Sequence, residues 1–317
     1  MIKIGIIGLN EGNGHPFSYA AIFNGYDPDA LQKRCPFELI REYLPREHRN
    51  ENLLGGAKIT HIWTQDRELS EDVAAVSLIP NIVDNYADLI GKVDAVILAR
   101  DDVQNHLEIM KTFLKKKVPL FIDKQLVMTK GELDEFMKLA GSEYQFMAGS
   151  SARFARELAR VKSDIALDSV KTIHGVSRES WIRYGHHLFE GIAHLWGLDI
   201  DWVRSLSQSQ DHDIVQIHYH IGLNVILEFV KDAHLPIQFT AYSTNREPYV
   251  VPYTDYFYSF REMLKVFVSM VETGKPAIPR EEIIGIAKVV LAGDISKKNN
   301  GVAVSPATLA IIDSMNQ

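Results

Sequence analysis

The first fifteen residues constrain the fold most, because a short apolar run ends there in a glycine-rich turn. Residues 2–15 read IKIGIIGLNEGNGH. A strand that opens into such a turn is how a Rossmann unit begins, since glycines let the backbone approach a pyrophosphate at the N-terminus of the next helix. The spacing departs from G-x-G-x-x-G, because Asn10 stands where the second glycine is expected. The candidate cofactor-binding residues of this turn are Gly8, Asn10, Gly12, Asn13, Gly14 and His15.

Composition narrows the class of protein further. The 317 residues suit two domains of ordinary size, and 46% hydrophobic residues can fill two cores. A formal net charge of −7 argues against a nucleic-acid partner, which needs a broad basic face. The single cysteine, Cys35, suits a reducing cytoplasm and is expected to be buried. No apolar run reaches the roughly 18 residues of a membrane span, so we expect a cytoplasmic protein without a membrane partner.

In the first half of the chain, predicted strands alternate with predicted helices. The strands are expected at residues 3–7, 59–64, 95–99, 120–122 and 145–148, and the helices at 70–75, 83–90, 104–116 and 130–141. This alternation predicts βαβ units and a parallel sheet whose C-terminal strand ends share one crevice. Residues 24–58 interrupt the pattern and carry Pro28, Pro36 and Pro45. They predict an inserted helical lobe that serves as a lid or subunit contact, or a plain surface insertion.

The second half has a different pattern. Residues 171–180 alternate, 186–196 and 258–273 have helical spacing, and a further helix is expected at 280–296. The strand-like runs at 214–220, 224–229 and 237–242 follow one another without helices between them, which predicts antiparallel pairing. The predicted fold is therefore α/β, with an N-terminal doubly wound Rossmann sheet and a C-terminal α+β domain whose largely antiparallel sheet has an open face.

Two groups of residues have the chemistry of a catalytic site. Lys124 follows a predicted buried strand, where its ammonium can bind a nicotinamide or a substrate hydroxyl, although most such lysines are simply solvated. His187, Glu190 and His194 share one helix face, where a histidine can act as general acid or base. Two alternatives remain for this face. It could bind a metal, with His218 and His220 as further ligands, or its histidines could be structural.

Asp66 ends the second predicted strand, where a carboxylate accepts hydrogen bonds from an adenosine ribose and disfavours a 2′-phosphate. Arg67 beside it could do the reverse. The sequence therefore favours NAD over NADP as cofactor. The alternative is that Asp66 caps the following helix.

In this order, the fragments resemble the glucose–fructose oxidoreductase / inositol dehydrogenase / MocA (Gfo/Idh/MocA) family of NAD(P)-dependent oxidoreductases. The stretch VILARDDVQNHLEIMKTFLKKKVPLFIDKQLVMT is similar to the family's run from a strand to its Glu-Lys-Pro motif. His106 falls on the family's helix histidine, and Lys124 on the motif lysine that the family places beside nicotinamide and substrate. Asp123 replaces the glutamate and Gln125 the proline. The resemblance adds Arg100, His106, Asp123 and Lys124 to the candidate cofactor-binding residues.

A second part of the resemblance lies further on. FMAGSSARFARE looks like the family's strand that ends in Arg-Phe, here Arg153 and Phe154. The family's Asp-x-Gly-x-His-x-x-Asp motif matches from Arg183 to Glu190, and the match continues through Leu195 and Gly197. His187 takes the place of the catalytic histidine. Arg183 stands where the family has its first aspartate, which predicts either an anionic substrate or a weakened active site.

The resemblance implies a Rossmann domain at residues 1–123 and a substrate-binding and oligomerisation domain at 124–317, with the active site between them. It implies hydride transfer between nicotinamide and a carbinol carbon of a sugar, polyol or nucleotide sugar. His187 would exchange the hydroxyl proton, Lys124 would polarise the oxygen, and Arg183 and Glu190 would hold the substrate or tune His187. A homodimer or homotetramer is expected. The alternative is a regulatory or sugar-binding protein of the same fold with weakened cofactor binding.

Overall fold

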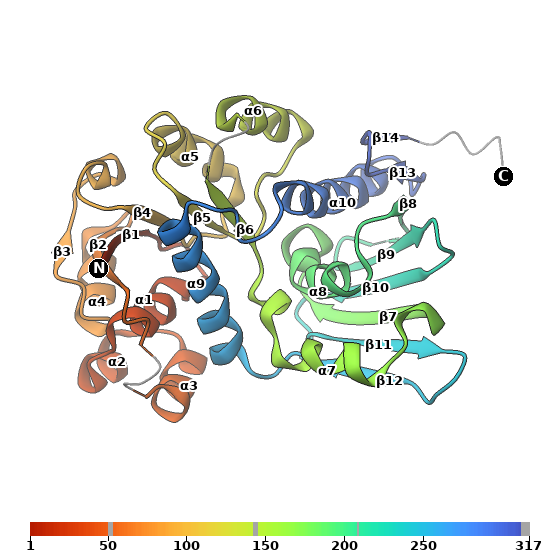
Figure 1. Cartoon of the computed structure of the whole chain (residues 1–317), viewed down its shortest axis with the longest axis horizontal. Helices are drawn as coiled ribbons and strands as arrows, with labels where there is room; N and C mark the ends of the chain where they lie inside the picture. The colour runs from red at the N-terminus through yellow and green to blue at the C-terminus, as the bar shows by residue number, and fades with distance from the viewer. Residues whose placement is uncertain (50–52, 142–144, 208, 312–317) are drawn as a thin grey trace. The chain divides into compact units, whose positions relative to one another are not determined.

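The computed structural model describes the chain except for residues 50–52, 142–144, 208 and 312–317 (Figure 1). The chain divides into two units. Unit 1 comprises Met1–Ala148 and Phe260–Ile278, and unit 2 comprises Gly149–Ser259 and Pro279–Gln317. The division falls after Ala148 rather than at residue 123, because the strand that follows the next helix adds to the sheet of unit 1.

Unit 1 is built on a six-stranded sheet with the order β3-β2-β1-β4-β5-β6. The strands are β1 (Ile2–Ile7), β2 (Ala57–Trp63), β3 (Asn81–Ile82), β4 (Ala95–Leu98), β5 (Leu120–Asp123) and β6 (Phe146–Gly149). β1 pairs in parallel with β2 and β4, and β4 pairs in parallel with β5. All residues of β4 and β5 are buried, as expected for parallel strands covered on both faces. The predicted Rossmann sheet is confirmed.

The helices of unit 1 begin and end at recognisable signals. Outside the insertion they are α1 (His15–Asn24), α4 (Arg67–Val76), α5 (His106–Leu114), α6 (Lys130–Ala140) and most of α9 (Tyr256–Thr273). Thr129 and Glu132 form a capping box at the start of α6, and Gly141 ends that helix with a positive φ. α9 joins unit 1 from far along the chain, and its Phe267 packs against Phe121 of β5 with 5.7 Å between ring centroids.

The insertion between α1 and β2 forms two helices, α2 (Pro28–Arg34) and α3 (Glu38–Glu47), which lie beside α1 in Figure 1. Phe37, just before α3, and Ile40 in its first turn lie over Gly14. An added Cβ at Gly14 would lie 2.6 Å from Ile40 Cδ1 and 2.7 Å from Phe37 Cδ2. Gly14 therefore makes room for the inserted segment, and the predicted helical lobe is confirmed for its described residues.

Unit 2 holds an eight-stranded mixed sheet with the order β12-β11-β7-β10-β9-β8-β13-β14. Its strands are β7 (Val170–Arg178), β8 (Ile200–Ser205), β9 (His212–Tyr219), β10 (Asn224–Val230), β11 (Gln238–Ser243), β12 (Tyr249–Pro252), β13 (Val304–Ser305) and β14 (Ala310–Ile311). The consecutive strands β9 and β10 pair antiparallel, as predicted. The next consecutive strands, β10 and β11, do not pair with each other, because β7 lies between them, parallel to β10 and antiparallel to β11. The predicted largely antiparallel sheet is therefore confirmed.

Two helices, α8 (Trp181–Trp196) and α10 (Arg280–Lys298), cover one face of this sheet (Figure 1). Buried and half-buried residues alternate along β9 and β10, because one side chain in two faces the helices. Trp181 joins the layers, since its indole Nε1 donates to the carbonyl of Val290 at 2.9 Å and its ring packs on Phe229. The other face keeps half-buried side chains, and the predicted homo-oligomer stays a prediction.

The local predictions failed in several places. Residues 83–90 form one 3-10 turn, η2 (Tyr86–Leu89), because Asn85 and Asp88 make a capping box over a single turn. The polar helix α7 (Arg156–Asp164) and the strands β8 and β12 were not predicted. α7 buries only Leu158 and Val161, too few apolar residues for a clear periodic pattern.

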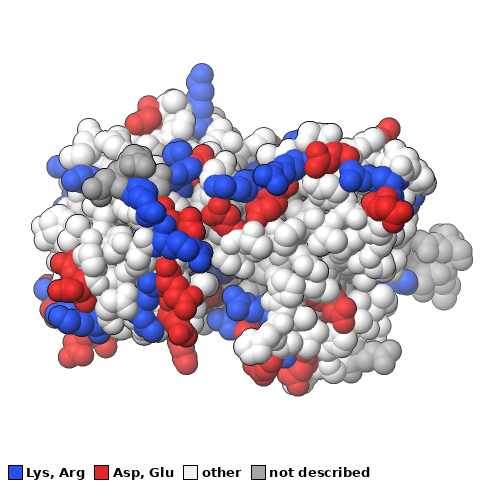
Figure 2. Space-filling model, turned by 90° about the horizontal axis from the view of Figure 1, so that it is seen from below, with Lys and Arg blue, Asp and Glu red and all other residues white. Residues whose placement is uncertain are grey.

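Figure 2 shows one face of the molecule, on which acidic and basic side chains are interspersed. This face therefore offers no continuous basic surface of the kind that binds nucleic acid. Among the residues that the structure describes, no helix combines the length and apolar character that crossing a membrane requires.

The packing over Gly14 can be tested by adding one methyl group. We expect Gly14→Ala to lower the free energy of unfolding by about 1–3 kcal/mol, because the new Cβ would overlap Phe37 and Ile40. Gly131→Ala is the matched control. It adds a methyl group in α6 where no atom lies within 4 Å, so it should raise stability by about 0.5–1 kcal/mol. Urea unfolding of the three proteins measures both changes, and equal effects would contradict the packing role.

Candidate functional site

A buried carboxylate organises the C-terminal edge of the sheet in unit 1. Asp123, the last residue of β5, has a side chain only 2% exposed. Its Oδ1 accepts from the Tyr19 hydroxyl at 3.2 Å, and its Oδ2 contacts Nδ1 of His15. Because a carboxylate only accepts, His15 Nδ1 carries the proton of this bond. Burial, followed by the charge of Asp123, raises the pKa of Tyr19, so its hydroxyl remains a donor. The residues predicted at this edge therefore lie together.

Lys124 occupies the same buried cluster. Its ammonium side chain is 7% exposed, and Nζ lies 3.5 Å from Asp101 Oδ2 and 4.0 Å from Asp123 Oδ2. Asn10 holds Asp101 in place, since its Oδ1 accepts from the Asp101 backbone N–H at 3.0 Å and its Nδ2 donates to the Asp101 carboxylate. The asparagine at the second glycine position thus fixes a carboxylate beside Lys124.

In the glycine turn, the backbone N–H groups that remain for an anion belong to the loop rather than to the start of α1. At Gly8 an added Cβ would lie 2.3 Å from Pro16 Cγ, so only glycine allows this tight turn into α1. Asn13 Oδ1 accepts from the His15 N–H at 2.9 Å and Pro16 has no N–H, so the start of α1 offers few donors. The backbone N–H groups of Glu11 and Gly12, two exposed residues, donate to no group in the described part of the chain. These residues fit a pyrophosphate held by the loop amides.

Arg100, a predicted cofactor-binding residue, instead supports the turn after β4. Arg100 donates to both carboxylate oxygens of Asp102, at 2.7 and 2.5 Å, and to Gln65 Oε1 at 2.8 Å. Burial acts to raise the pKa of Asp102, but hydrogen bonds from Arg100 and Asn105 outweigh it and lower that pKa. Direct binding of the cofactor by Arg100 stays a prediction.

His106 is fully buried at the start of α5. Its Nδ1 lies 3.0 Å from the Gln125 carbonyl and its Nε2 3.1 Å from the Arg100 carbonyl. Burial lowers the pKa of His106, and a neutral imidazole donates to one of these carbonyls at a time. His106 therefore fixes the turns after β4 and β5, and its predicted contact with cofactor stays a prediction.

At the end of β2, Asp66 is exposed and caps α4 by accepting from the Glu68 N–H at 2.9 Å. The capping alternative is therefore confirmed, while Oδ2 of the same carboxylate faces no described donor. Arg67 is paired with two carboxylates, Glu71 at 3.3 Å and Asp84 at 2.7 Å. Of the two side chains, Asp66 has the freer polar atom for a ribose.

In unit 2, the candidate catalytic histidine is positioned by a serine. Ser150 follows β6, and its Oγ lies 2.7 Å from Nδ1 of His187 on α8. The same Oγ accepts from the Ala152 N–H at 3.2 Å. Tyr184, one turn before His187, packs on the imidazole with 5.0 Å between ring centroids. The ring of His187 is therefore held at Nδ1 by Ser150 and on its face by Tyr184.

Glu190 binds the backbone of this serine. Its side chain is buried, and its Oε2 accepts from the Ser150 N–H at 2.6 Å. Gly149 makes room for it, since an added Cβ there would lie 2.4 Å from Glu190 Oε1. Burial raises the pKa of Glu190 to about 8, while the charge of Arg153 opposes the rise. In this position Glu190 holds the turn that carries Ser150, and contact with substrate stays a prediction.

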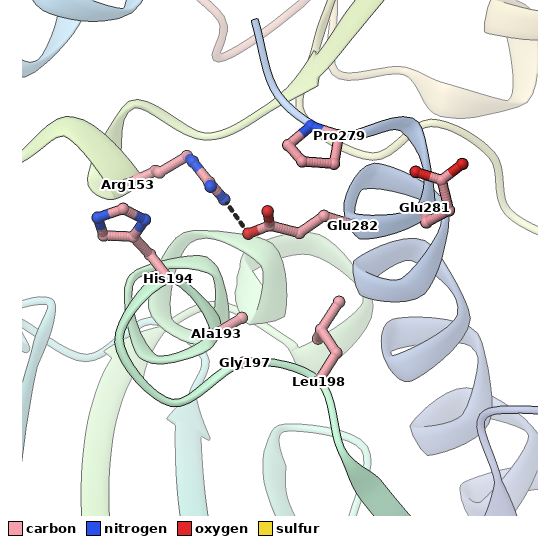
Figure 3. Close-up of a pocket in the computed structure, with 8 residues that line it drawn as sticks. All are labelled: Arg153, Ala193, His194, Gly197, Leu198, Pro279, Glu281 and Glu282. Atoms are coloured by element: carbon pink, nitrogen blue, oxygen red, sulfur yellow. Dashed lines mark hydrogen bonds and ion pairs between the residues drawn. The ribbon is translucent and has the colours of Figure 1, made fainter. Parts of the chain in front are cut away.

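The remaining predicted residues of α8, Arg183 and His194, make other contacts. Arg183 is exposed, with Nη1 3.6 Å from Glu179 Oε2. His194 lines a hollow of about 470 Å³ at the C-terminal end of α8 (Figure 3), together with Arg153, Ala193, Gly197, Leu198, Pro279, Glu281 and Glu282. Burial, followed by the charge of Arg153, lowers the pKa of His194. Arg153 is bound to Glu282 at 2.5 Å, and His187 does not line this hollow.

The described residues do not support the metal-binding alternative. Within them, no group of three or more His, Cys, Asp or Glu side chains is arranged to hold a metal ion. His218 stacks on Trp202 and its Nδ1 lies 3.2 Å from Asn224 Oδ1, on the sheet rather than near α8. His187 and Glu190 are explained without metal, by their contacts with Ser150.

The sequence analysis missed four residues of these clusters: Tyr19, Asp101, Ser150 and, as a paired side chain, Gln65. Asp101 follows the buried strand β4 by three residues, and Ser150 follows the buried strand β6 directly, which is a signal that the sequence contains. Tyr19 lies one turn after His15, and only the fold shows that its hydroxyl points to Asp123.

Comparison with known proteins supports the predicted resemblance. Residues 38–148 match the sequence model of the Gfo/Idh/MocA family, described as an oxidoreductase family with an NAD-binding Rossmann fold. The match covers most of unit 1, including β5 and Lys124. A comparison with curated proteins finds no match.

The chain is also similar to solved dehydrogenase structures along nearly its whole length. Scyllo-inositol dehydrogenase from Lactobacillus casei with bound NAD(H) and scyllo-inositol is 13% identical, with a TM-score of 0.71 over 97% of this chain and 99% of that chain. Myo-inositol 2-dehydrogenase from Lactobacillus plantarum is 15% identical, with a TM-score of 0.72 over 96% and 99%. An oxidoreductase from Thermotoga maritima is 18% identical, with a TM-score of 0.68 over 98% and 99%. At these identities the similarity shows the fold.

The environment of Glu190 gives a pH-dependent stability that can be measured. Its pKa is near 4.5 when exposed and about 8 in the fold, so the folded protein binds the extra proton between these values. The stabilisation from this proton is complete below the lower pKa and is lost as the pH rises through about 8, by roughly 4–5 kcal/mol in total. Glutamine does not titrate, so the free energy of unfolding of Glu190→Gln should not fall in this way. The difference between the variant and wild type should therefore shift in favour of the variant from pH 5 to pH 9.

Urea unfolding at pH 5, 7 and 9 provides the measurement. Glu42→Gln, on an exposed residue of α3, is the control and should follow the wild-type curve. Parallel curves for wild type and Glu190→Gln would show that the buried carboxyl does not titrate as described.

Proposed function

We propose that this chain, whose residues 38–148 belong to the Gfo/Idh/MocA oxidoreductase family, transfers a hydride between NAD and a carbinol carbon of a sugar or polyol. The observation that carries the proposal is the buried ammonium of Lys124 at the C-terminal edge of the Rossmann sheet, between Asp101 and Asp123. Ligands of such sheets bind at this edge. The inositol dehydrogenases with the same fold suggest the polyol class.

The loop amides of Glu11 and Gly12 and the Asp66 carboxylate would hold the dinucleotide at its pyrophosphate and adenosine ribose. When bound, NAD supplies the acceptor or donor of the hydride. Lys124 would donate a hydrogen bond to the substrate oxygen and stabilise the negative charge that develops there. Two carboxylates within 4.0 Å compensate this ammonium, so it can be buried at the site.

His187 would exchange the proton of the substrate hydroxyl at Nε2. Its Nδ1 faces Ser150 Oγ, and a hydroxyl can either donate to a bare Nδ1 or accept from a protonated one. Ser150 can therefore follow both protonation states of His187 without moving, which suits a reaction that runs in both directions. Ser150 is in this proposal a positioning residue, held by Glu190.

One set of contacts favours a second candidate, a sugar-binding or regulatory protein of the same fold with weak cofactor binding. Asn13 already caps the first N–H of α1, and the buried Asp123 lies against His15 at the same helix end. A carboxylate at a helix N-terminus occupies the electrostatic position that a pyrophosphate prefers.

Cofactor binding separates the two candidates. We expect a saturable fluorescence change with NADH and binding about tenfold weaker with NADPH, because Asp66 disfavours a 2′-phosphate and Arg67 is already paired. Asp66→Ser should reduce this preference, since serine keeps the helix cap but removes the charge. No saturable change with either nucleotide would contradict the proposal and support the second candidate.

Turnover tests the roles of the two side chains. With NAD and a panel that starts with myo- and scyllo-inositol, Lys124→Ala and His187→Ala should each lower kcat by about 100-fold or more. Lys58→Ala and His220→Ala, at exposed positions, are the controls and should retain wild-type turnover. If a substrate is found and both site variants stay within about tenfold of wild type, the assigned roles are wrong.

A further inference from the structure

Gln125 follows Lys124 and has an unusual backbone conformation. Its φ is +34°, in the left-handed region that a residue with a side chain seldom adopts. Such backbone is found mainly where the surrounding structure enforces it, often at ligand sites. Here the backbone is fixed by His106, whose Nδ1 lies 3.0 Å from the Gln125 carbonyl. The chain therefore places this side chain at a defined point after β5.

The side-chain nitrogen of Gln125, Nε2, has no hydrogen-bond acceptor among the described residues. The residue is 4% exposed, and Nε2 donates to no group in the described part of the chain. A buried N–H without an acceptor destabilises a fold, and an apolar residue of the same shape would avoid the cost. Strained backbone and an unpaired donor thus coincide one residue from Lys124.

We propose that the Gln125 amide donates to a neutral oxygen of the bound ligand, a hydroxyl or a carbonyl. This inference rests on the proposed function and adds a specificity-determining residue to it. A neutral acceptor is favoured because Asp101 and Asp123 lie in the same buried cluster as one ammonium, Lys124, so a further anion would be repelled. The oxygen belongs either to the nicotinamide carboxamide or ribose of the cofactor, or to a hydroxyl of the polyol.

The variant Gln125→Met tests this role, because methionine has nearly the shape of glutamine and cannot donate. Both residues carry a side chain at φ +34°, so the backbone strain is the same in the two proteins. Without ligand, we expect Gln125→Met to raise Tm by about 2 °C or more, since it removes a buried unpaired donor. Gln145→Met is the control. Its amide donates to the Gly274 carbonyl at 3.2 Å, so its loss should not raise Tm.

Ligand binding gives the second measurement, with full-length protein. If the acceptor is on the cofactor, Gln125→Met should weaken NADH binding by about five- to tenfold relative to wild type and Gln145→Met. If the acceptor is on the polyol, NADH binding should be unchanged, and the thermal shift that myo- or scyllo-inositol produces with NAD present should fall instead. Either pattern, together with the higher Tm, supports the proposal.

Two results overturn it. A Tm for Gln125→Met equal to or below that of wild type would show that the amide is paired in the free protein. A higher Tm with unchanged NADH and inositol binding would show that no ligand uses the amide. Failure of wild type to bind NADH contradicts the proposed function instead, whereas the sign of the Tm change still decides whether the Gln125 donor is unpaired.

Discussion

The cost of burying the carboxylate of Asp123 determines how the edge of the Rossmann sheet is built. A charge removed from water needs partners, or it destabilises the fold by several kcal/mol. Three elements supply them: His15 and Tyr19 from α1, Asn13 from the turn before it, and Lys124 beside it. α1 must therefore begin where it does for its first two turns to meet Asp123. The Asp123 carboxylate therefore links the glycine turn, the first turns of α1 and Lys124 through its contacts.

Unit 2 also buries a carboxyl group, Glu190, but stabilises it in a different way. Glu190 is buried as deeply as Asp123, but its direct partner is the N–H of Ser150. Burial raises its pKa to about 8, so at neutral pH the group is mostly protonated, and its desolvation cost is small. The neutral carboxyl still accepts from the backbone and holds Ser150 against His187. In unit 1, the charge of Asp123 is compensated by the opposite charge of Lys124. In unit 2, Glu190, which holds Ser150 against His187, is favoured in its neutral form.

The sequence predicts what depends on local patterns and misses what depends on distant contacts. β4 and β5 were found because short, wholly apolar runs are typical of buried parallel strands, and Lys124 then had to lie at the sheet edge. Ser150 was not found, since it meets His187 and Glu190 across 37 and 40 residues. The helix predicted at 83–90 failed because Asn85 and Asp88 cap a single turn, a local competition that apolar spacing does not show.

Two departures from the family pattern in unit 1, Asn10 and Asp123, are linked through Asp101 and Lys124. Asn10 at the second glycine binds Asp101, Asp101 lies 3.5 Å from Lys124, and Lys124 lies 4.0 Å from Asp123, the residue in place of the family's glutamate. A glycine at position 10 would remove the amide that orients Asp101, and the ammonium would lose a placed partner. If a site decayed through unrelated substitutions, its buried polar groups would lose their hydrogen-bond partners, and each loss would destabilise the fold. Substitutions that satisfy one another instead describe a site whose polar contacts are rearranged, and this favours an altered ligand over the loss of one.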